Sequence, residues 1–240
     1  MKSTPLLTIL PDSSHDAATN MAIDASLLNS ASLENAFFRH YKWTEPTVTF
    51  GYTQSIQEVR AAVSASIALC RRLTGGGIVD HRNDWTYALV LHSQIETAQI
   101  RATELYAKVH RCIQKALADQ SITTQLAPCP RLCGQTSEPT TGPSQCFVTS
   151  TKDDIINANG KKIAGAAMKR TRESTLIQGS IDRSALPITL NYKEFSKRFT
   201  ATLSNAFNLA LSEDLKNFPD EQLIEQEEKR FRSADWINIR

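Results

Sequence analysis

Two kinds of hydrophobic spacing alternate along the chain, and together they predict its secondary structure. Apolar residues recur at helical spacing over residues 102–120, where Leu105, Val109 and Leu117 would share one face. A nearly continuous apolar run over residues 85–92 is typical of a strand buried at the centre of a sheet. The same reasoning predicts helices over residues 12–30, 192–212 and 219–230, and strands over residues 37–41, 47–52, 67–73, 78–81 and 174–181. This order predicts an α+β fold in which helices cover a mixed β-sheet.

A tight turn and one long connection separate the later elements. Asn159-Gly160 lies between the apolar stretches of residues 154–157 and 162–165, and an Asn-Gly pair in this setting is a strong signal for a β-hairpin. Residues 127–145 are rich in Pro, Gly, Ser and Thr, so we predict a loop there. Its length exceeds the usual connection between elements, and loops of this kind are often functional.

Composition restricts the class of protein. The chain has 240 residues, of which 41% are hydrophobic and 22% charged, values that predict one large domain over residues 1–240. The formal net charge of +2 is small, which argues against nucleic-acid binding and against strong attraction to a membrane. The first apolar run covers only Leu6 to Leu10, which is too short for a signal peptide or a membrane span. We therefore expect a cytoplasmic protein.

Five cysteines occur in the chain, namely Cys70, Cys112, Cys129, Cys133 and Cys146. Their odd number and the absence of a secretory signal favour reduced thiols over a disulfide scaffold. Cys129, Cys133 and Cys146 have a spacing that a zinc site can use, but no further cysteine pair or histidine pair follows them. We therefore expect no bound metal.

A glycine-rich segment, RRLTGGGIVDH over residues 71–81, is the most informative part of the chain. Because glycine has no Cβ, three consecutive glycines let the backbone approach a ligand closely. The two arginines beside them supply positive charge and planar donors for a carboxylate or a phosphate. Taken alone, the segment is also compatible with a tight turn between strands that carries surface arginines.

The segment and its surroundings resemble the lipoate–protein ligase and octanoyltransferase superfamily, in which "RR-x-(S/T)-GGG-x-V-x-H" lines an acyl pocket. The resemblance extends over almost the whole chain through further motifs in the same order, which are NMAID (20–24), FRHYKW (38–43), NDWTY (83–87), GKKIAGAA (160–167), QGSI (178–181) and KRFRSADW (229–236). It implies the fold of the biotin/lipoate protein ligase catalytic domain. It also implies that residues 1–240 form a single catalytic domain without the small accessory C-terminal domain of some ligases.

The resemblance assigns catalysis to Lys162 and Cys146. Lys162 matches the family lysine that binds the acyl carbonyl, and an ammonium there would stabilise a developing oxyanion. Cys146 stands in a "C-F" pair sixteen residues before Lys162, close to the position of the acyl-accepting cysteine of Cys/Lys-type octanoyltransferases. The plain alternatives are an exposed hairpin lysine and a buried, unreactive cysteine.

The remaining candidate residues would bind the substrate. Arg72 is the arginine we assign to an anionic ligand, Gly165 and Ala166 are small where the acyl chain must pass, and Asp154 matches an aspartate of the family. Gln178 occupies a position where many relatives carry histidine, which is a departure from the family pattern. The full set of predicted substrate-binding residues is Arg72, Thr74, Gly75, Gly76, Gly77, His81, Asn83, Asp154, Gly165, Ala166, Gln178 and Gly179.

These residues lead to three alternative functions. In the first, Cys146 takes an octanoyl or lipoyl group from octanoyl-acyl-carrier protein and delivers it to a lysine of a lipoyl-domain protein, such as a 2-oxoacid dehydrogenase subunit or the glycine-cleavage H protein, without a cofactor. The second is a lipoate–protein ligase that needs ATP, Mg²⁺ and lipoate and forms lipoyl-AMP. The third is a non-catalytic relative that binds lipoyl domains. The presence of Cys146 favours the transferase.

Overall fold

The computed structural model describes residues 4–30, 35–129 and 150–239. Within these residues, nine strands form one large mixed sheet with the order β12-β1-β3-β7-β11-β10-β9-β8, and β2 pairs with the end of β3. The strands are β1 (Leu6–Ile9), β2 (Ser13–His15), β3 (Ala36–Trp43), β7 (Asp84–His92), β8 (Gln125–Leu126), β9 (Ile155–Ile156), β10 (Lys162–Arg170), β11 (Ser174–Asp182) and β12 (Ala210–Ser212). Pairing is parallel around β1 and antiparallel from β3 to β8. The predicted mixed sheet is therefore confirmed.

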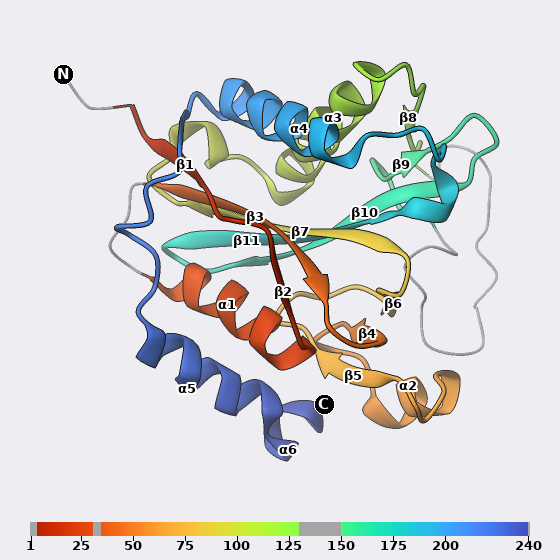
Figure 1. Ribbon diagram of the computed structural model, residues 1–240, viewed down its shortest axis with the longest axis vertical. Coiled ribbons are helices and arrows are strands. Elements are labelled where there is room, and N and C mark those ends of the chain that lie inside the picture. Colours follow the sequence, from red (N-terminus) through yellow and green to blue (C-terminus); the bar gives the residue numbers. More distant parts are fainter. Residues whose placement is uncertain (1–3, 31–34, 130–149, 240) are drawn as a thin grey trace.

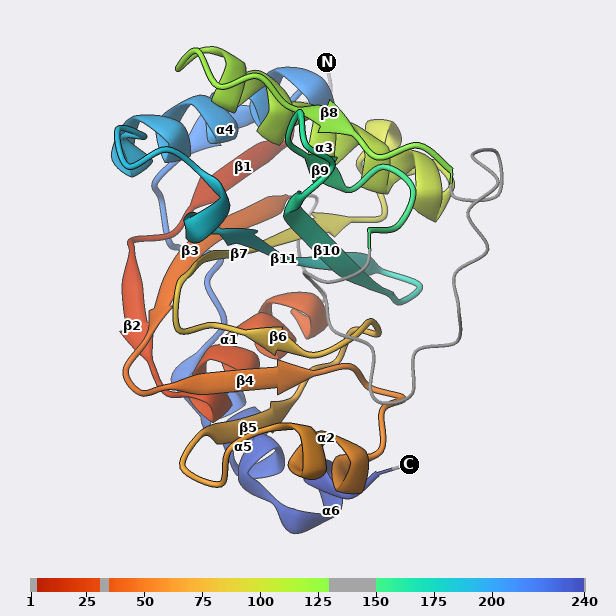
Figure 2. The same ribbon diagram turned by 90° about the vertical axis from the view of Figure 1, so that its right-hand side faces the viewer.

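A second, smaller sheet faces one side of the large sheet. Its three described strands have the order β5-β4-β6, with β4 (Thr47–Phe50) between β5 (Ala68–Arg71) and β6 (Val79–Asp80). The connection from β4 to β5 contains the short helix α2 (Ile56–Ala62), which the sequence analysis did not predict. Figure 2 shows β4, β5 and β6 as a separate layer between the large sheet and the C-terminal helices.

Helices cover both faces of the large sheet (Figure 1). On one face lie α3 (Ala102–Ala118) and α4 (Tyr192–Phe207) with two short 3₁₀ turns, Glu96–Ala98 and Arg183–Ala185. On the other side lies α1 (Ala17–Asn29), with α5 (Glu221–Arg232) packed against α1 and α6 (Ala234–Ile237) packed against α5 and β5. Each face has its own buried apolar cluster, because the strands between them are buried on both sides. The predicted α+β fold, a mixed sheet covered by helices, is confirmed.

Two helix boundaries differ from the sequence-based expectation. Residues 12–15 are not the first turn of a helix, since Ser13–His15 forms β2 and the side chain of Asp16 caps α1 by accepting from Thr19 N–H. The helix predicted over residues 192–212 ends at Phe207, because Asn208 takes a left-handed conformation with φ 53° and the chain then enters β12. In both places a strand pairing with a distant segment replaces local helix.

Other elements lie where the sequence placed them. Strand β7 is central in the large sheet, between β3 and β11. Strands β9 and β10 form the predicted hairpin, and Gly160 in its turn has φ 77°, a conformation that glycine adopts without a steric penalty. In the part of the chain that the structure describes, no helix has both the length and the apolar character needed to span a bilayer.

Candidate active site

A central cavity lies between the large sheet and the small sheet. One wall comes from strands β3, β7, β10 and β11, and the other comes from β4, β6 and the glycine loop, which we define as residues 74–77. About 430 Å³ of space in and above this cavity is not filled by protein atoms. It is lined by Met21, Tyr41, Trp43, Thr49, Arg72, Gly76, Gly77, Val79, His81, Thr86, Gly165, Ala166, Ala167, Gln178, Gly179 and Ser180.

The register of the large sheet gives the direction of this cavity. Gly165 pairs with Ser180, Ser180 with Thr86, and Thr86 with Tyr41, so these four residues form one row across four strands. Neighbouring strands are about 4.8 Å apart, and the row is therefore roughly 14 Å long. A slender, mostly apolar ligand that enters beside Gly165 would run across the strands towards Tyr41.

Glycine is required where the glycine loop meets its neighbours. A Cβ on Gly51 would lie 2.0 Å from the carbonyl oxygen of Gly76, a distance that no side chain tolerates. Gly76 itself has φ 88°, and a Cβ there would come within 3.6 Å of Ala167 in the opposite wall. The loop therefore packs closely against Gly51 and comes near Ala167 in the opposite wall, the close backbone approach that the GGG motif predicted.

Arg72 holds the glycine loop in place. Its guanidinium donates to the carbonyl oxygens of Gly75 and Gly77, at 2.9 Å each, and to the hydroxyl of Thr49 at 2.7 Å. Arg72 also lines the cavity. Its contact with an anionic ligand stays a prediction, whereas its contacts with the glycine loop are present in the structure.

Arg71 fixes the C-terminal helix to the end of β5. It is buried, and its guanidinium donates to the carbonyl oxygens of Tyr52, Gln54 and Ile237. In return, the indole N–H of Trp236 donates to the carbonyl oxygen of Arg71 at 3.0 Å. These contacts tie α6 to the residue that precedes the loop-holding Arg72.

Gln178 connects the glycine loop to helix α1. Its side-chain oxygen accepts from the hydroxyl of Thr74 at 2.8 Å, and its amide donates to Asp24 at 2.8 Å. Burial raises the pKa of Asp24, while the ion pair with Arg39 at 2.9 Å opposes this effect. Although many relatives carry histidine here, the Gln178 amide has a hydrogen-bond partner for both its oxygen and its nitrogen in this buried network.

His81 occupies a defined orientation in the cavity wall. Its Nδ1 lies 2.8 Å from Asp84 Oδ2, and its Nε2 lies 2.8 Å from the hydroxyl of Thr49. A neutral ring with its proton on Nδ1 satisfies both contacts, because Thr49 can donate to Nε2 while it accepts from Arg72. The ring also stacks on Trp43, with centroids 4.2 Å apart. These partners make His81 a wall residue with a fixed orientation.

Lys162 lies at the edge of the cavity, beside Gly165. A register shift between Lys162 and Ala164 interrupts the pairing of β10 with β9, and the Lys162 side chain crosses the face of Gly165. Its Nζ is 2.8 Å from Asp154 Oδ2, and the side chain is only 5% exposed. By contrast, Lys161 is exposed, as predicted, and pairs with Asp182 at 3.5 Å.

Asp154 collects four hydrogen bonds and is fully buried. Besides Lys162, its Oδ2 accepts from the backbone N–H of Thr151 at 2.6 Å and from the Thr151 hydroxyl at 3.1 Å. Its Oδ1 accepts from the hydroxyl of Tyr106 on α3. Burial, followed by the neighbouring carboxylate of Asp154, raises the pKa of Tyr106 well above its ordinary value.

The structure brings most of the predicted substrate-binding residues together. Thr74 and Gly75 belong to the glycine loop without lining the cavity, and Asp154 supports Lys162 from behind. Asn83 lies on the exposed β6–β7 turn, in a separate surface hollow beside Arg82. Cys146 and Cys133 lie outside the described residues. The residues that line the cavity as expected are Arg72, Gly76, Gly77, His81, Gly165, Ala166, Gln178 and Gly179.

Several residues of the site were not predicted. Tyr41 and Trp43 alternate along β3 with residues that face α4, so their spacing could have placed them on the cavity side. Thr49 and Tyr106 had no such signal, because their contacts join residues far apart in the sequence.

Residues 16–200 match the family model of the lipoyl protein ligase A/B catalytic domain.

The chain belongs to this family.

Relatives of known name share sequence with most of the chain. The octanoyltransferase LipM of Oceanobacillus iheyensis is 28% identical over 235 residues, which cover 95% of this chain and 75% of the relative. LipM of Halalkalibacterium halodurans is 26% identical over 91% of this chain and 72% of the relative. LipM of Staphylococcus aureus is 28% identical over 70% of this chain and 62% of the relative.

Solved structures share the fold. The putative lipoate protein ligase Ta0514 from T. acidophilum, with bound lipoic acid, has a TM-score of 0.75 at 19% identity, over 99% of this chain and 100% of that one. A lipoate-protein ligase A bound with ATP also has a TM-score of 0.75, at 18% identity over 99% of both chains. The expected family and the expected biotin/lipoate protein ligase-like fold are therefore confirmed.

Proposed function

We propose that this chain is a protein lipoylation enzyme that transfers an octanoyl group to a lysine of a lipoyl-domain protein. The observation that carries the proposal is the buried ammonium of Lys162, held beside Gly165 at the edge of a mostly apolar cavity. An acyl chain that ran along this cavity would have its carbonyl carbon next to the Lys162 ammonium. The LipM relatives, which are octanoyltransferases by name, support this function.

The first step is a thioester exchange at Cys146. The sulfur of Cys146 attacks the carbonyl carbon of an octanoyl thioester on an acyl-carrier protein, and a new C–S bond forms as the carrier C–S bond breaks. The proton of the Cys146 thiol passes to the departing carrier thiolate. One thioester is consumed and one is made, so this route needs no cofactor.

The second step moves the acyl group to the acceptor. The neutral amine of the lipoyl-domain lysine attacks the Cys146 thioester, an amide bond forms, and the C–S bond breaks. One amine proton passes to the Cys146 thiolate. In both steps the Lys162 ammonium stabilises the negative charge on the tetrahedral oxygen, since a fixed charge in a water-poor site stabilises the transition state strongly.

The proposed partners are two proteins, an acyl-carrier protein as donor and a lipoyl-domain protein as acceptor. Three basic residues, Lys169, Arg170 and Arg172, lie at the turn between β10 and β11 and are exposed. Lys169 Nζ is 5.6 Å from the centre of the Tyr52 ring, next to the glycine loop. We infer that this turn contacts the acidic carrier protein. Reversal of the three charges should raise the KM for the carrier and leave the KM for the acceptor unchanged; equal effects on both would contradict this docking site.

A lipoate–protein ligase is the second candidate, because the solved structures of the same fold include ligases bound to lipoic acid or ATP. That route would use lipoate, ATP and Mg²⁺, with the adenylate phosphate near Lys162 and Arg72. Cys146 has no chemical role in it. The two routes therefore differ in their requirement for Cys146 and for ATP.

The decisive experiment is intact-mass measurement after the protein is mixed with octanoyl-acyl-carrier protein in the absence of ATP. We expect an added octanoyl mass on the wild-type protein, none on Cys146→Ser, and the full adduct on the matched control Cys129→Ser. No adduct on the wild type, together with lipoylation of a lipoyl domain once lipoate, ATP and Mg²⁺ are present, would establish the ligase. Binding of the lipoyl domain without either reaction would identify a non-catalytic relative.

A further inference from the structure

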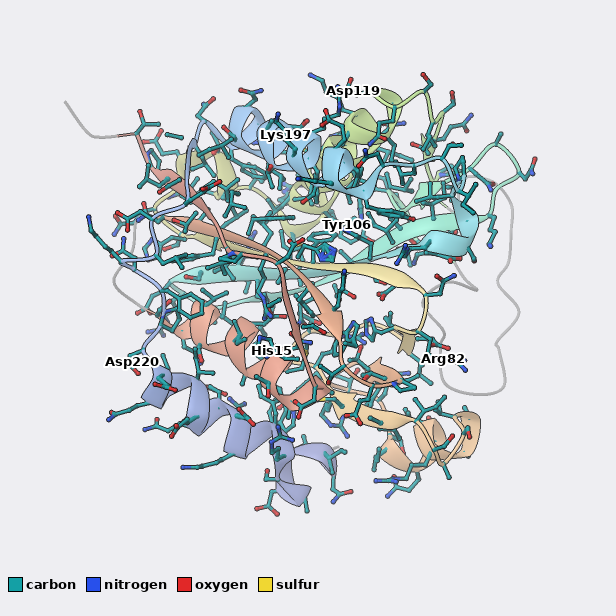
Figure 3. The ribbon with its side chains drawn as sticks, viewed as in Figure 1. His15, Arg82, Tyr106, Asp119, Lys197 and Asp220 are labelled. Carbon is teal, nitrogen blue, oxygen red and sulfur yellow. The ribbon has the colours of Figure 1, made fainter. Side chains whose placement is uncertain are left out.

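We propose that Tyr106 is a positioning residue that acts on Lys162 through Asp154. The inference rests on the proposed acyl transfer and adds a residue on α3, far from the glycine loop and the predicted catalytic pair. Figure 3 shows Tyr106 between the α3–α4 layer and the large sheet.

The Tyr106 hydroxyl makes two contacts, one as donor and one as acceptor. It donates to Asp154 Oδ1 and accepts from the backbone N–H of Ala166 at 3.2 Å. Ala166 lines the central cavity, and Asp154 Oδ2 binds Lys162 Nζ at 2.8 Å. One hydroxyl therefore joins the wall of the acyl cavity to the carboxylate that fixes the catalytic ammonium.

Asp154 also binds Thr151, a residue that precedes β9. Its Oδ2 accepts both the backbone N–H and the hydroxyl of Thr151, a residue five positions after Cys146 in the sequence. A carboxylate that rotates would change its contacts with Lys162 and Thr151 together. The hydroxyl of Tyr106 occupies Oδ1 and opposes that rotation, so it sets the position of Lys162 relative to Thr151.

The ring of Tyr106 has a separate, purely structural contact. It packs edge to face against His110, one helical turn along α3, with centroids 4.1 Å apart. Replacement by phenylalanine keeps this contact and removes only the hydroxyl. The variant therefore separates the proposed positioning from packing.

The chain offers a matched control in Tyr87. Tyr87 is fully buried whereas Tyr106 is half-buried, and within the described residues the Tyr87 hydroxyl has no hydrogen-bond partner. Tyr87→Phe removes the same atom without disturbing a contact to Asp154. Any general effect of losing a buried hydroxyl would appear in both variants.

The experiment measures octanoyl transfer by steady-state kinetics, with thermal unfolding recorded alongside. Displacement of a catalytic group by about 1 Å can cost on the order of 100-fold in rate. We expect Tyr106→Phe to lower kcat by about 10- to 100-fold with KM within about twofold of wild type, and Tyr87→Phe to match the wild type. Equal kcat in Tyr106→Phe and wild type would overturn the inference, and so would equal losses in both phenylalanine variants.

A double-mutant cycle with Asp154→Asn tests the route of the effect. If Tyr106 acts through the carboxylate, its removal should reduce kcat much less in the Asp154→Asn background than in the wild type. Multiplicative losses would mean that Tyr106 acts elsewhere and would also overturn the inference. Absence of any octanoyl adduct on the wild-type protein would instead contradict the proposed function itself, so the two failures are distinguishable.

Discussion

Replacement of Gly165 by alanine should reduce catalysis far more than it reduces stability. A Cβ at this position would lie 2.6 Å from Cε and 2.7 Å from Nζ of Lys162, and 3.1 Å from Asp154 Oδ1. Ordinary contact begins at 3.4 Å, so the end of the Lys162 side chain must retreat by about 0.8 Å. A lysine side chain can move this far at modest cost, and we expect a loss of about 1–2 kcal/mol in unfolding free energy.

The same retreat moves the ammonium away from the proposed position of the acyl carbonyl. Misplacing a catalytic group by about 1 Å can cost on the order of 100-fold in rate. For a shift of about 0.8 Å we therefore expect the rate of octanoyl transfer to fall by roughly 30- to 100-fold. The assay combines transfer rates with urea unfolding, and Gly75→Ala serves as a control for stability alone, because a Cβ on Gly75 meets no atom within 4 Å. A wild-type transfer rate in Gly165→Ala would refute the reasoning, as would a loss of stability large enough to unfold the variant.

Three further predictions concern the support of the cavity. Gln178→Leu removes the amide contacts to Thr74 and Asp24, while Asp24 keeps its contacts with Arg39 and Tyr41, and it should cost about 2 kcal/mol in urea unfolding; an unchanged midpoint would show that the amide contacts contribute nothing. Burial lowers the pKa of His110 from 6.5 to about 4, so the unfolded state takes up the proton first as pH falls. The contribution of neutral His110 to the free energy of unfolding should be fully present above pH 6.5 and decline by up to about 3 kcal/mol towards pH 4. His110→Phe should flatten this decline; parallel plots of unfolding free energy against pH for the variant and the wild type would contradict the assignment. Trp236→Phe removes the indole hydrogen bond to β5, and we expect a loss of about 1 kcal/mol, or a Tm lower by about 2–4 °C in a thermal melt.

The fold was predictable wherever local spacing decides the structure. The apolar run of β7, the helical spacing of α3 and the Asn-Gly turn before β10 each report on a few neighbouring residues, and all three lie where expected. Strand β2 was not predictable, because its three residues pair with Tyr41–Trp43 and not with their sequence neighbours. Helix α2 has only seven residues and gave too short a pattern to recognise.

The residues of the candidate site also fall into those that the sequence predicts and those that only the fold reveals. The glycine loop and Lys162 belong to continuous motifs, so the sequence alone pointed to them. Tyr106 and Asp154 are 48 residues apart, and Gln178 and Asp24 are 154 residues apart. Only the folded sheet brings such pairs together, and a single sequence contains no record of which distant polar residues will meet.

The clamp between Arg71 and α6 sets an order of events during synthesis. The ribosome makes the glycine loop early, but the carbonyl oxygen of Ile237 and the indole of Trp236 that hold the preceding strand come roughly 160 residues later. At about 5–20 residues per second, this delay is on the order of 10–30 s. During that time the loop lacks its last restraint, so a nascent chain has no finished acyl cavity. Commitment to an acyl substrate is thereby deferred until the segment that carries Trp236 and Ile237 has been made.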